Sequence, residues 1–424
     1  MGSIWRGFWA GVGFRVHARH RLDLPVKDIL FGLLSCVRPW RRERLEAEIL
    51  GLCSAENEGL VCFSVRSGWN LWLAAKGLRA GDEVLVSAVT HPDMVRIIRA
   101  HDLCAVPVDI DPETLAPRPC MLEAALTPRT RAVLVAHLFG GRMDLGPVAR
   151  FAREHGLFLV EDCAQAFQGP ERVGDTAADV SMYSFGTLKT STALGGAVLL
   201  VRDRGVLRSM RELQAAYHVQ RRSWYLNKLL RALGLAEVTR PLPYGLLVRA
   251  CVWLGCDLDA LVNGAVRAFP PREPDATFFR RLRQRSSAPL LAMLRRRLMT
   301  FDGGWLARRA SAGERFAGRL EIATEHPGWR ALQRTHWLFP VVVRDPEALI
   351  LGLRDSGLDA SQATSSIAVV EAPAGRRSPS GASLMMSGVV FLPVNPGLPS
   401  HVFDVMVDLV NDCSAGGVVE PVAV

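Results

Sequence analysis

Residues 156–169 read G-L-F-L-V-E-D-C-A-Q-A-F-Q-G, and residues 173–201 read V-G-D-T-A-A-D-V-S-M-Y-S-F-G-T-L-K-T-S-T-A-L-G-G-A-V-L-L-V. The apolar run 157–160 ends in an acidic pair whose second member is Asp162. This pattern is typical of a buried parallel strand with polar residues at its carboxyl end. Because ligands of open α/β sheets bind at that end of the strands, we expect Asp162 to lie in a binding site.

Lys189 stands in a turn between two further predicted strands, 180–185 and 197–201. A lysine in such a place is unusual, since lysines lie mostly on solvated faces. A carboxylate at a strand end and a lysine 27 residues later (189 − 162) suggest pyridoxal phosphate. Lys189 would form a Schiff base, and Asp162 would keep the pyridine nitrogen protonated so that the ring acts as an electron sink. The alternative is that Asp162 caps a helix and Lys189 lies on the surface.

Two segments carry a resemblance to a known family. E-D-C-A-Q-A-F-Q-G and Y-S-F-G-T-L-K are similar to E-D-A-A-Q-A-H-G-A and F-S-F-H-P-T-K of the DegT/DnrJ/EryC1/StrS family of pyridoxal-phosphate aminotransferases, with Lys189 in register. The likeness covers about residues 55–205 and returns weakly after residue 283. It implies a type I pyridoxal-phosphate transferase fold, an α/β architecture with a mainly parallel sheet, helices on both faces and a small C-terminal α+β domain.

The resemblance also implies an activity. Family members make amino sugars by moving an amino group from glutamate or glutamine to a keto-acceptor, commonly a nucleotide-linked keto-sugar, and they work as homodimers. Lys189 would be the catalytic base. Related dehydratases carry histidine in place of this lysine, so Lys189 argues against that reaction here. A second alternative is a pyridoxal-phosphate-binding regulatory or membrane-associated scaffold protein without transaminase turnover.

Other cofactor-binding residues are carried over by position. Asp162 would pair with the pyridine nitrogen, Gln165 would orient the phenolic oxygen, and Ser184 would contact the phosphate. His91 stands where the family places an aromatic residue over the ring, and an imidazole can stack in a similar way. His91 could instead simply begin a helix.

The phosphate motif departs from the family. The family holds the phosphate with a Gly-Thr pair at a helix start, and the aligned positions here are Val65 and Arg66. Helix starts offer unpaired N–H groups and a positive dipole end, and glycine lets an anion approach the backbone. We therefore expect the phosphate site to be formed by Arg66, Ser67 and Gly68, any of which could make the direct contact. Ser67 could also cap the helix.

The pattern of apolar runs predicts the remaining elements. We expect strands at 61–65, 84–86, 105–110, 131–136, 337–343 and 389–392, helices at 41–50, 68–76, 345–356 and 401–410, and a polar loop at 373–383. The expected division is an N-terminal arm and helix (1–50), a large cofactor domain (51–205), a divergent helical insertion (206–282), and a connecting helix with a small C-terminal domain (283–424).

Composition narrows the class of protein. The 424 residues are 49% hydrophobic and 22% charged, which is typical of a globular chain. A net charge of +9 favours anionic partners, but no nucleic-acid-binding motif accompanies it. The nine cysteines are odd in number and never spaced C-x-x-C, so we expect reduced thiols in a cytoplasmic protein and no metal site.

Two divergent segments combine aromatic residues with arginine. Residues 1–16 and 241–256 are too short and too interrupted to cross a bilayer. They could form one surface that contacts the inner face of a membrane. The alternatives are arms that embrace a partner subunit and, for 241–256, a helical hairpin that covers the active site.

Overall fold

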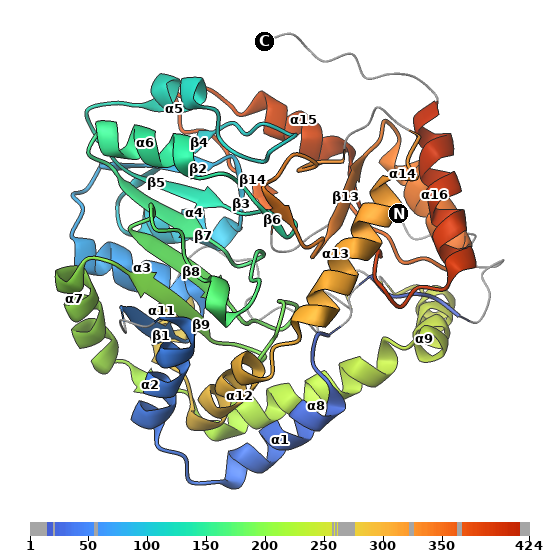
Figure 1. Ribbon diagram of the computed structural model, residues 1–424, viewed down its shortest axis with the longest axis horizontal. Helices are drawn as coiled ribbons and strands as arrows, with labels where there is room; N and C mark the ends of the chain where they lie inside the picture. The colour runs from blue at the N-terminus through green and yellow to red at the C-terminus, as the bar shows by residue number, and fades with distance from the viewer. Residues whose placement is uncertain are drawn as a thin grey trace.

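The computed structural model describes residues 15–415 except 20–21, 55–57, 257, 259–260, 262–275, 322–325 and 363–366. A seven-stranded sheet in the order β1-β9-β8-β7-β5-β2-β4 forms its centre (Figure 1). The strands are β1 (Gly59–Cys62), β2 (Glu83–Ser87), β4 (Cys104–Val108), β5 (Thr130–Ala136), β7 (Phe158–Asp162), β8 (Val180–Ser184) and β9 (Ala197–Val201). Strands β8, β7, β5, β2 and β4 run parallel, while β9 is antiparallel to both β8 and β1. The predicted mainly parallel α/β sheet is confirmed.

Helices cover both faces of the sheet. Alternate residues of a strand point to opposite faces, and in β2 Val84 and Val86 join one core while Leu85 joins another. The first core lies under α3 (Val65–Lys76), α4 (Pro92–Ala100) and α7 (Arg204–Ala215), and the second under α5 (Pro119–Ala125) and α6 (Gly146–Glu154).

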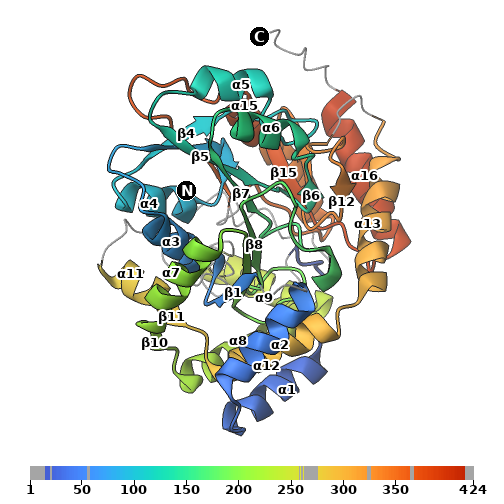
Figure 2. The same ribbon diagram turned by 60° about the vertical axis from the view of Figure 1, so that its left-hand side comes forward.

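A helical layer packs below the β1–β9 end of the sheet. It consists of α1 (Val26–Val37), α2 (Arg42–Cys53), α8 (Arg222–Val238) and α12 (Ala288–Met299). Helix α12 packs against α1 and α2, and α1 packs against α8 (Figure 2). This layer brings the divergent segment after residue 205 next to the central sheet, because Tyr225 and Leu229 of α8 share a core with Val198 of β9.

The segment 241–256 forms one helix rather than a hairpin. This helix, α9 (Pro241–Leu254), exposes Leu242, Leu246, Trp253 and Leu254. The N–H of Val16 donates to the carbonyl of Pro241 (2.9 Å), so the end of the N-terminal arm lies at the start of α9. The rest of the predicted arm surface, residues 1–14, lies outside the described residues. In the described part of the chain, no helix is long and apolar enough to span a bilayer.

The C-terminal part is a small α+β unit. Its strands β13 (Phe339–Val342) and β15 (Val389–Leu392) pair antiparallel. They share a core with α13 (Gly303–Ala317), α14 (Pro346–Asp355) and α16 (Ser400–Ala415). Short strand pairs, β3 (Val89–Thr90) with β14 (Ala368–Val369) and β6 (Gly141–Arg142) with β12 (Gln333–Arg334), join this unit to the large sheet. The remaining elements are α11 (Ala276–Leu282), α15 (Ser380–Gly388), and the parallel pair β10 (His218–Val219) and β11 (Gln284–Arg285).

Two predicted boundaries are wrong. The strand expected at 61–65 ends at Cys62, and the helix expected from Gly68 begins at Val65. The cause is Ser64, whose side chain accepts the N–H of Ser67 and so starts the helix three residues early. The polar loop expected at 373–383 contains the first turn of α15, in which the hydroxyl of Ser383 donates to the carbonyl of Pro379 (2.8 Å).

Candidate active site

Asp162 and Ser184 end two neighbouring parallel strands. They are the last residues of β7 and β8, so both lie at the carboxyl edge of the sheet. Asp162 is 6% exposed, and its Oδ1 accepts the N–H of Ala164 (2.9 Å). Burial raises the pKa of Asp162, although the Ala164 bond and the nearby charge of Lys189 oppose the shift. Asp162 is therefore a buried carboxylate close to the charge of Lys189, and it can accept a further hydrogen bond at this edge of the sheet.

The turn after β8 carries Lys189 in a fixed position. Its N–H donates to the carbonyl of Gly186 (3.0 Å), and the hydroxyl of Thr192 donates to the same carbonyl (2.6 Å). Two residues beyond the lysine, the N–H of Ser191 donates to Oδ2 of Asp23 (2.5 Å) from the N-terminal segment. These bonds hold the lysine turn between the sheet and the segment before α1.

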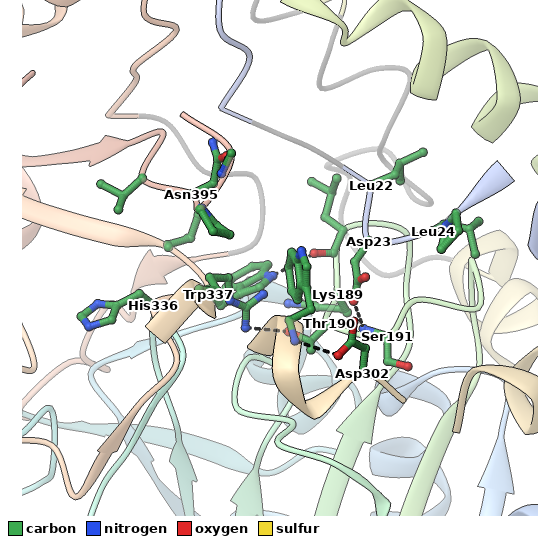
Figure 3. A pocket seen from close by; sticks show the side chains of 18 of the residues that line it. Leu22, Asp23, Leu24, Lys189, Thr190, Ser191, Asp302, His336, Trp337 and Asn395 are labelled. Carbon is green, nitrogen blue, oxygen red and sulfur yellow. Dashed lines mark hydrogen bonds between the residues drawn. The ribbon is translucent and has the colours of Figure 1, made fainter. Parts of the chain in front are cut away.

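Lys189 points to an aromatic ring of the small domain. Its Nζ lies 4.2 Å from the centroid of Trp337, and the indole N–H of Trp337 donates to the carbonyl of Leu188 (2.8 Å) (Figure 3). Burial lowers the pKa of Lys189 to about 8, with Asp162 raising it and the charge of Arg66 lowering it. The amine is therefore neutral in a substantial fraction of molecules near pH 8, as a nucleophile or proton carrier must be.

A cavity of about 490 Å³ opens beside Lys189. Figure 3 shows that its walls come from distant parts of the chain: Asp23 before α1, Lys189 and Thr190 in the turn, and Asn395 in the small domain. Arg309 of α13 also lines it, donating to Oγ1 of Thr190 (3.2 Å) and to the carbonyl of Thr335 (2.8 Å). The cavity has the size of a small-ligand site and reaches the lysine from the small-domain side.

Gln165 and His91 each accept one hydrogen bond from the backbone and keep a second polar side-chain atom that could bind a ligand. Oε1 of Gln165 accepts the N–H of Phe139 (2.8 Å), and its Nε2 donates to none of the described residues. Nδ1 of His91 accepts the N–H of Asp93 (3.1 Å), which leaves the other ring nitrogen to carry the proton. Burial and the charge of Arg66 lower the pKa of His91 to about 3, so its ring is neutral.

The three predicted phosphate residues differ in their surroundings. Arg66 forms an ion pair with Asp93 (2.7 Å) and is close enough to Lys189 to lower its pKa. Ser67 donates its hydroxyl to the carbonyl of Leu282 (2.8 Å). Gly68 faces β9, because a Cβ there would lie 2.4 Å from a methyl group of Leu199. The surroundings favour Arg66 as an anion ligand, while Ser67 and Gly68 serve cap and packing contacts; all three stay predictions.

A buried polar cluster lies at the same edge of the sheet. Glu161 accepts hydrogen bonds from Nε2 of His137 (3.0 Å), Oγ of Ser181 (2.5 Å) and Sγ of Cys163 (3.3 Å), and it lies 3.5 Å from Arg142. Burial would raise the pKa of Glu161, but these bonds lower it to about 2. The ligand atoms of His137, Glu161 and Cys163 lie within 4.8 Å of one another. The carboxylate is already satisfied by protein donors and faces an arginine, so we assign the cluster a structural role rather than a metal.

The sequence reasoning missed Trp337, Asp23, Arg309 and Asn395 as site residues. Trp337 was expected only as the start of a strand. Asp23 and Arg309 lie in segments without a motif, and Asn395 lies in the stretch P-V-N-P-G-L, from which no site residue was predicted. They reach Lys189 only through the tertiary fold, and no local signal identifies them. Lys189, in contrast, lies within electrostatic reach of Asp162, Arg66 and His91, whose roles toward a cofactor stay predictions.

The geometry can be compared with known proteins. Residues 41–234 match the family model "DegT/DnrJ/EryC1/StrS aminotransferase family". The chain is 30% identical over 192 residues to a GDP-perosamine synthase from Caulobacter vibrioides, covering 43% of this chain and 52% of that protein. It is 38% identical over 149 residues to an L-glutamine:2-deoxy-scyllo-inosose aminotransferase from Streptomyces kanamyceticus, covering 34% of each. The aligned stretch thus spans about half or less of these relatives.

The fold agreement extends over nearly the whole chain. The crystal structure of the aminotransferase TlmJ from Streptoalloteichus hindustanus superposes with a TM-score of 0.68 at 20% identity, covering 94% of this chain and 98% of that one. The type I fold implied by the resemblance is thereby confirmed. Residues 41–234, which include the motifs around Asp162 and Lys189, are therefore similar to the DegT/DnrJ/EryC1/StrS aminotransferase family.

Proposed function

We propose that the protein is a pyridoxal-phosphate-dependent aminotransferase that moves an amino group from glutamate or glutamine to a keto-sugar. The observation that carries this proposal is the arrangement of Asp162 and Lys189. Asp162 is a buried carboxylate at the end of β7, and Lys189, in the turn after the neighbouring strand β8, has a pKa of about 8 and lines a cavity of about 490 Å³. The names of the two relatives, one for a GDP-linked sugar and one for L-glutamine, support the acceptor and donor classes.

The residues present fit pyridoxal phosphate. Asp162 offers a carboxylate oxygen beyond its bond to Ala164, Nε2 of Gln165 is an available donor, and the ring of His91 is neutral and able to stack. When bound, the cofactor supplies an electron sink that stabilises a carbanion at the substrate Cα. Asp162 would hold the ring nitrogen protonated, Gln165 would orient the phenolic oxygen, and Ser184 and Arg66 would contact the phosphate.

Lys189 would carry the proton. Burial and the charge of Arg66 destabilise its ammonium form, so the amine can accept a proton near neutral pH and return it. Trp337 lies over Nζ and limits the directions in which the lysine can move. Asp23 fixes the turn two residues beyond the lysine, and this anchoring keeps the amine at the mouth of the cavity.

The direct test is reconstitution of the purified protein with pyridoxal phosphate. We expect a visible-edge absorption band that borohydride removes, and formation of 2-oxoglutarate from glutamate, or its amide from glutamine, with a panel of nucleotide-linked keto-sugars. A bound cofactor without turnover on any acceptor would favour the regulatory alternative. Absence of cofactor binding would contradict the proposal as a whole.

We infer from the family resemblance that the chain works as a homodimer. Exposed apolar side chains on the helical layer, Leu30, Leu34 and Val37 of α1 among them, are compatible with a subunit contact. Sedimentation equilibrium of the purified protein tests this inference directly: a monomer at micromolar concentration would contradict it.

We also propose a peripheral contact of α9 with an anionic membrane. Leu246, Trp253 and Leu254 of α9 are exposed apolar side chains, and the exposed Arg240 directly precedes this helix. Tryptophan beside cationic side chains is typical of helices that lie in the membrane interface. The sugar acceptor would then be membrane-proximal rather than freely soluble.

A further inference from the structure

Lys228 lies at the cofactor edge of the sheet although it belongs to the divergent insertion. Its Nζ donates to the carbonyl of Leu194 (3.1 Å) and lies 5.8 Å from the ring centroid of Phe63. Phe63 directly precedes Ser64, the N-cap of α3, and Leu194 lies three residues before β9. Helix α8 therefore places an ammonium group next to the start of α3.

The charge of Lys228 has no carboxylate partner among the described residues. Its neighbours are a backbone carbonyl, an aromatic ring and the cation of Arg66. Burial and the charge of Arg66 together lower the pKa of Lys228 to about 8. Buried cations normally pair with anions, because removing an ammonium from water is costly. Arg66 is already paired with Asp93 (2.7 Å), so Lys228 is the cation at this edge for which the described residues supply no anion.

Other donors converge on the same place. The N–H of Gly196 donates to the carbonyl of Phe63 (3.0 Å), and Ala197 pairs with Ser184, so these backbone positions join the end of β8 to the start of α3. The first N–H groups of α3 carry the positive end of the helix dipole. Ser184 adds a half-buried hydroxyl, whose Oγ has one contact at 3.4 Å to the N–H of Gly186. The start of α3, the hydroxyl of Ser184 and the two cations are the kinds of group that bind a phosphate.

We propose that Lys228, together with Arg66 and the first turn of α3, binds the phosphate of pyridoxal phosphate. This inference rests on the proposed function and deepens it: the insertion supplies a cation where the family uses a Gly-Thr pair and this chain has Val65 and Arg66. A dianionic phosphate would supply the anion that Lys228 lacks and would give Arg66 a second anionic partner beside Asp93. The divergent sequence of α8 is then part of the cofactor site rather than a surface addition.

The test separates phosphate recognition from recognition of the ring. Dissociation constants of pyridoxal phosphate and of pyridoxal, which lacks the phosphate, are measured by absorbance and fluorescence titration of the apo protein. Lys228→Gln keeps an N–H donor for the Leu194 carbonyl but removes the charge. We expect it to weaken pyridoxal phosphate binding about 10- to 100-fold and to leave pyridoxal binding unchanged. Lys228→Arg should keep most of the phosphate preference.

The control is Arg231→Gln, which removes one exposed charge from the same helix and should change neither constant. Inorganic phosphate provides a second readout: it should raise the Tm of the wild-type apo protein more than that of Lys228→Gln. If Lys228→Gln keeps the wild-type preference for pyridoxal phosphate over pyridoxal, the inference is overturned while the aminotransferase proposal stands. If the wild type binds pyridoxal phosphate no better than pyridoxal, the Lys228 inference and the aminotransferase proposal both fail.

Discussion

The Nζ atom of Lys189 and the indole ring of Trp337 lie 4.2 Å apart, although 148 residues (337 − 189) separate them in the chain. The contact joins the lysine turn of the large sheet to the first strand region of the small domain. It places an aromatic face over the amine in a site where burial already lowers the lysine pKa to about 8. The small domain therefore helps to set the properties of the lysine.

Lys189→Ala should remove the borohydride-sensitive absorption and lower turnover by at least about 10³-fold, because no other described amine lies over Trp337. The fold should persist, and circular dichroism provides that control. Full turnover in the variant would end the aminotransferase proposal.

Asp162→Asn should keep the bond to the Ala164 N–H through its amide oxygen and lose the negative charge beside Lys189. We expect turnover to fall about 10²- to 10³-fold with only modest weakening of cofactor binding, since the charge acts mainly on the protonated ring nitrogen. Single-turnover absorbance kinetics measure both quantities. Equal rates in wild type and variant would mean that another group holds the ring nitrogen.

Trp337→Leu should lower the pKa of Lys189 by roughly 0.4 to 0.7 of a unit. An aromatic face stabilises a nearby ammonium by about 0.5–1 kcal/mol, and leucine keeps the site dry while removing that stabilisation. The pH dependence of reductive methylation of Lys189 in the apo protein reports this pKa. An unchanged or raised value in the variant would show that the ring acts only by packing. Trp305→Leu, another tryptophan at the same cavity, is the matched control.

Glu161 should contribute stability that disappears in acid. Its pKa in the folded protein is about 2, below the ordinary value of 4.5, so the folded state favours the carboxylate form. The contribution is fully present above about pH 4.5 and is lost as the pH falls toward 2. Glu161→Gln should lower the free energy of unfolding at pH 7 by about 3–5 kcal/mol, because it leaves His137 and Arg142 without their anion. Urea unfolding measures this, and a variant as stable as wild type would contradict the role of the cluster.

The α9 face should bind anionic vesicles at low salt. We expect the intact protein to float with phosphatidylserine-containing liposomes and to dissociate as salt rises, since arginine attraction is screened. The double variant Trp253→Ser/Leu254→Ser should abolish flotation. Removal of residues 1–16 should do the same if this N-terminal arm and α9 form one membrane-binding surface. Leu332→Ser, at another exposed leucine, is the control. An intact protein that never floats but forms a salt-insensitive dimer would assign the face to a subunit contact instead.

The sequence predicted the sheet, and it indicated Asp162 and Lys189 as candidate site residues, because both inferences rest on local patterns. Strand β9 was expected at Ala197 to Val201 and lies there, and Asp162 and Lys189 follow strand ends that the apolar runs identify. The start of α3 was misplaced because Val61 to Val65 is rich in β-branched residues, while the cap depends on the single side chain of Ser64. Lys228 could not be predicted, since its position depends on how α8 packs against Phe63 and Leu194.

The cavity beside Lys189 has walls from Asp23 near one end of the chain and Asn395 near the other. A ribosome releases Asp23 and the lysine turn long before it makes Trp337 and Asn395. A nascent chain can therefore pair the sheet strands and present the lysine, but it cannot enclose a ligand until the small domain has emerged. Enclosure of a ligand in this cavity is accordingly a late event in the biogenesis of this protein, after translation has passed residue 395.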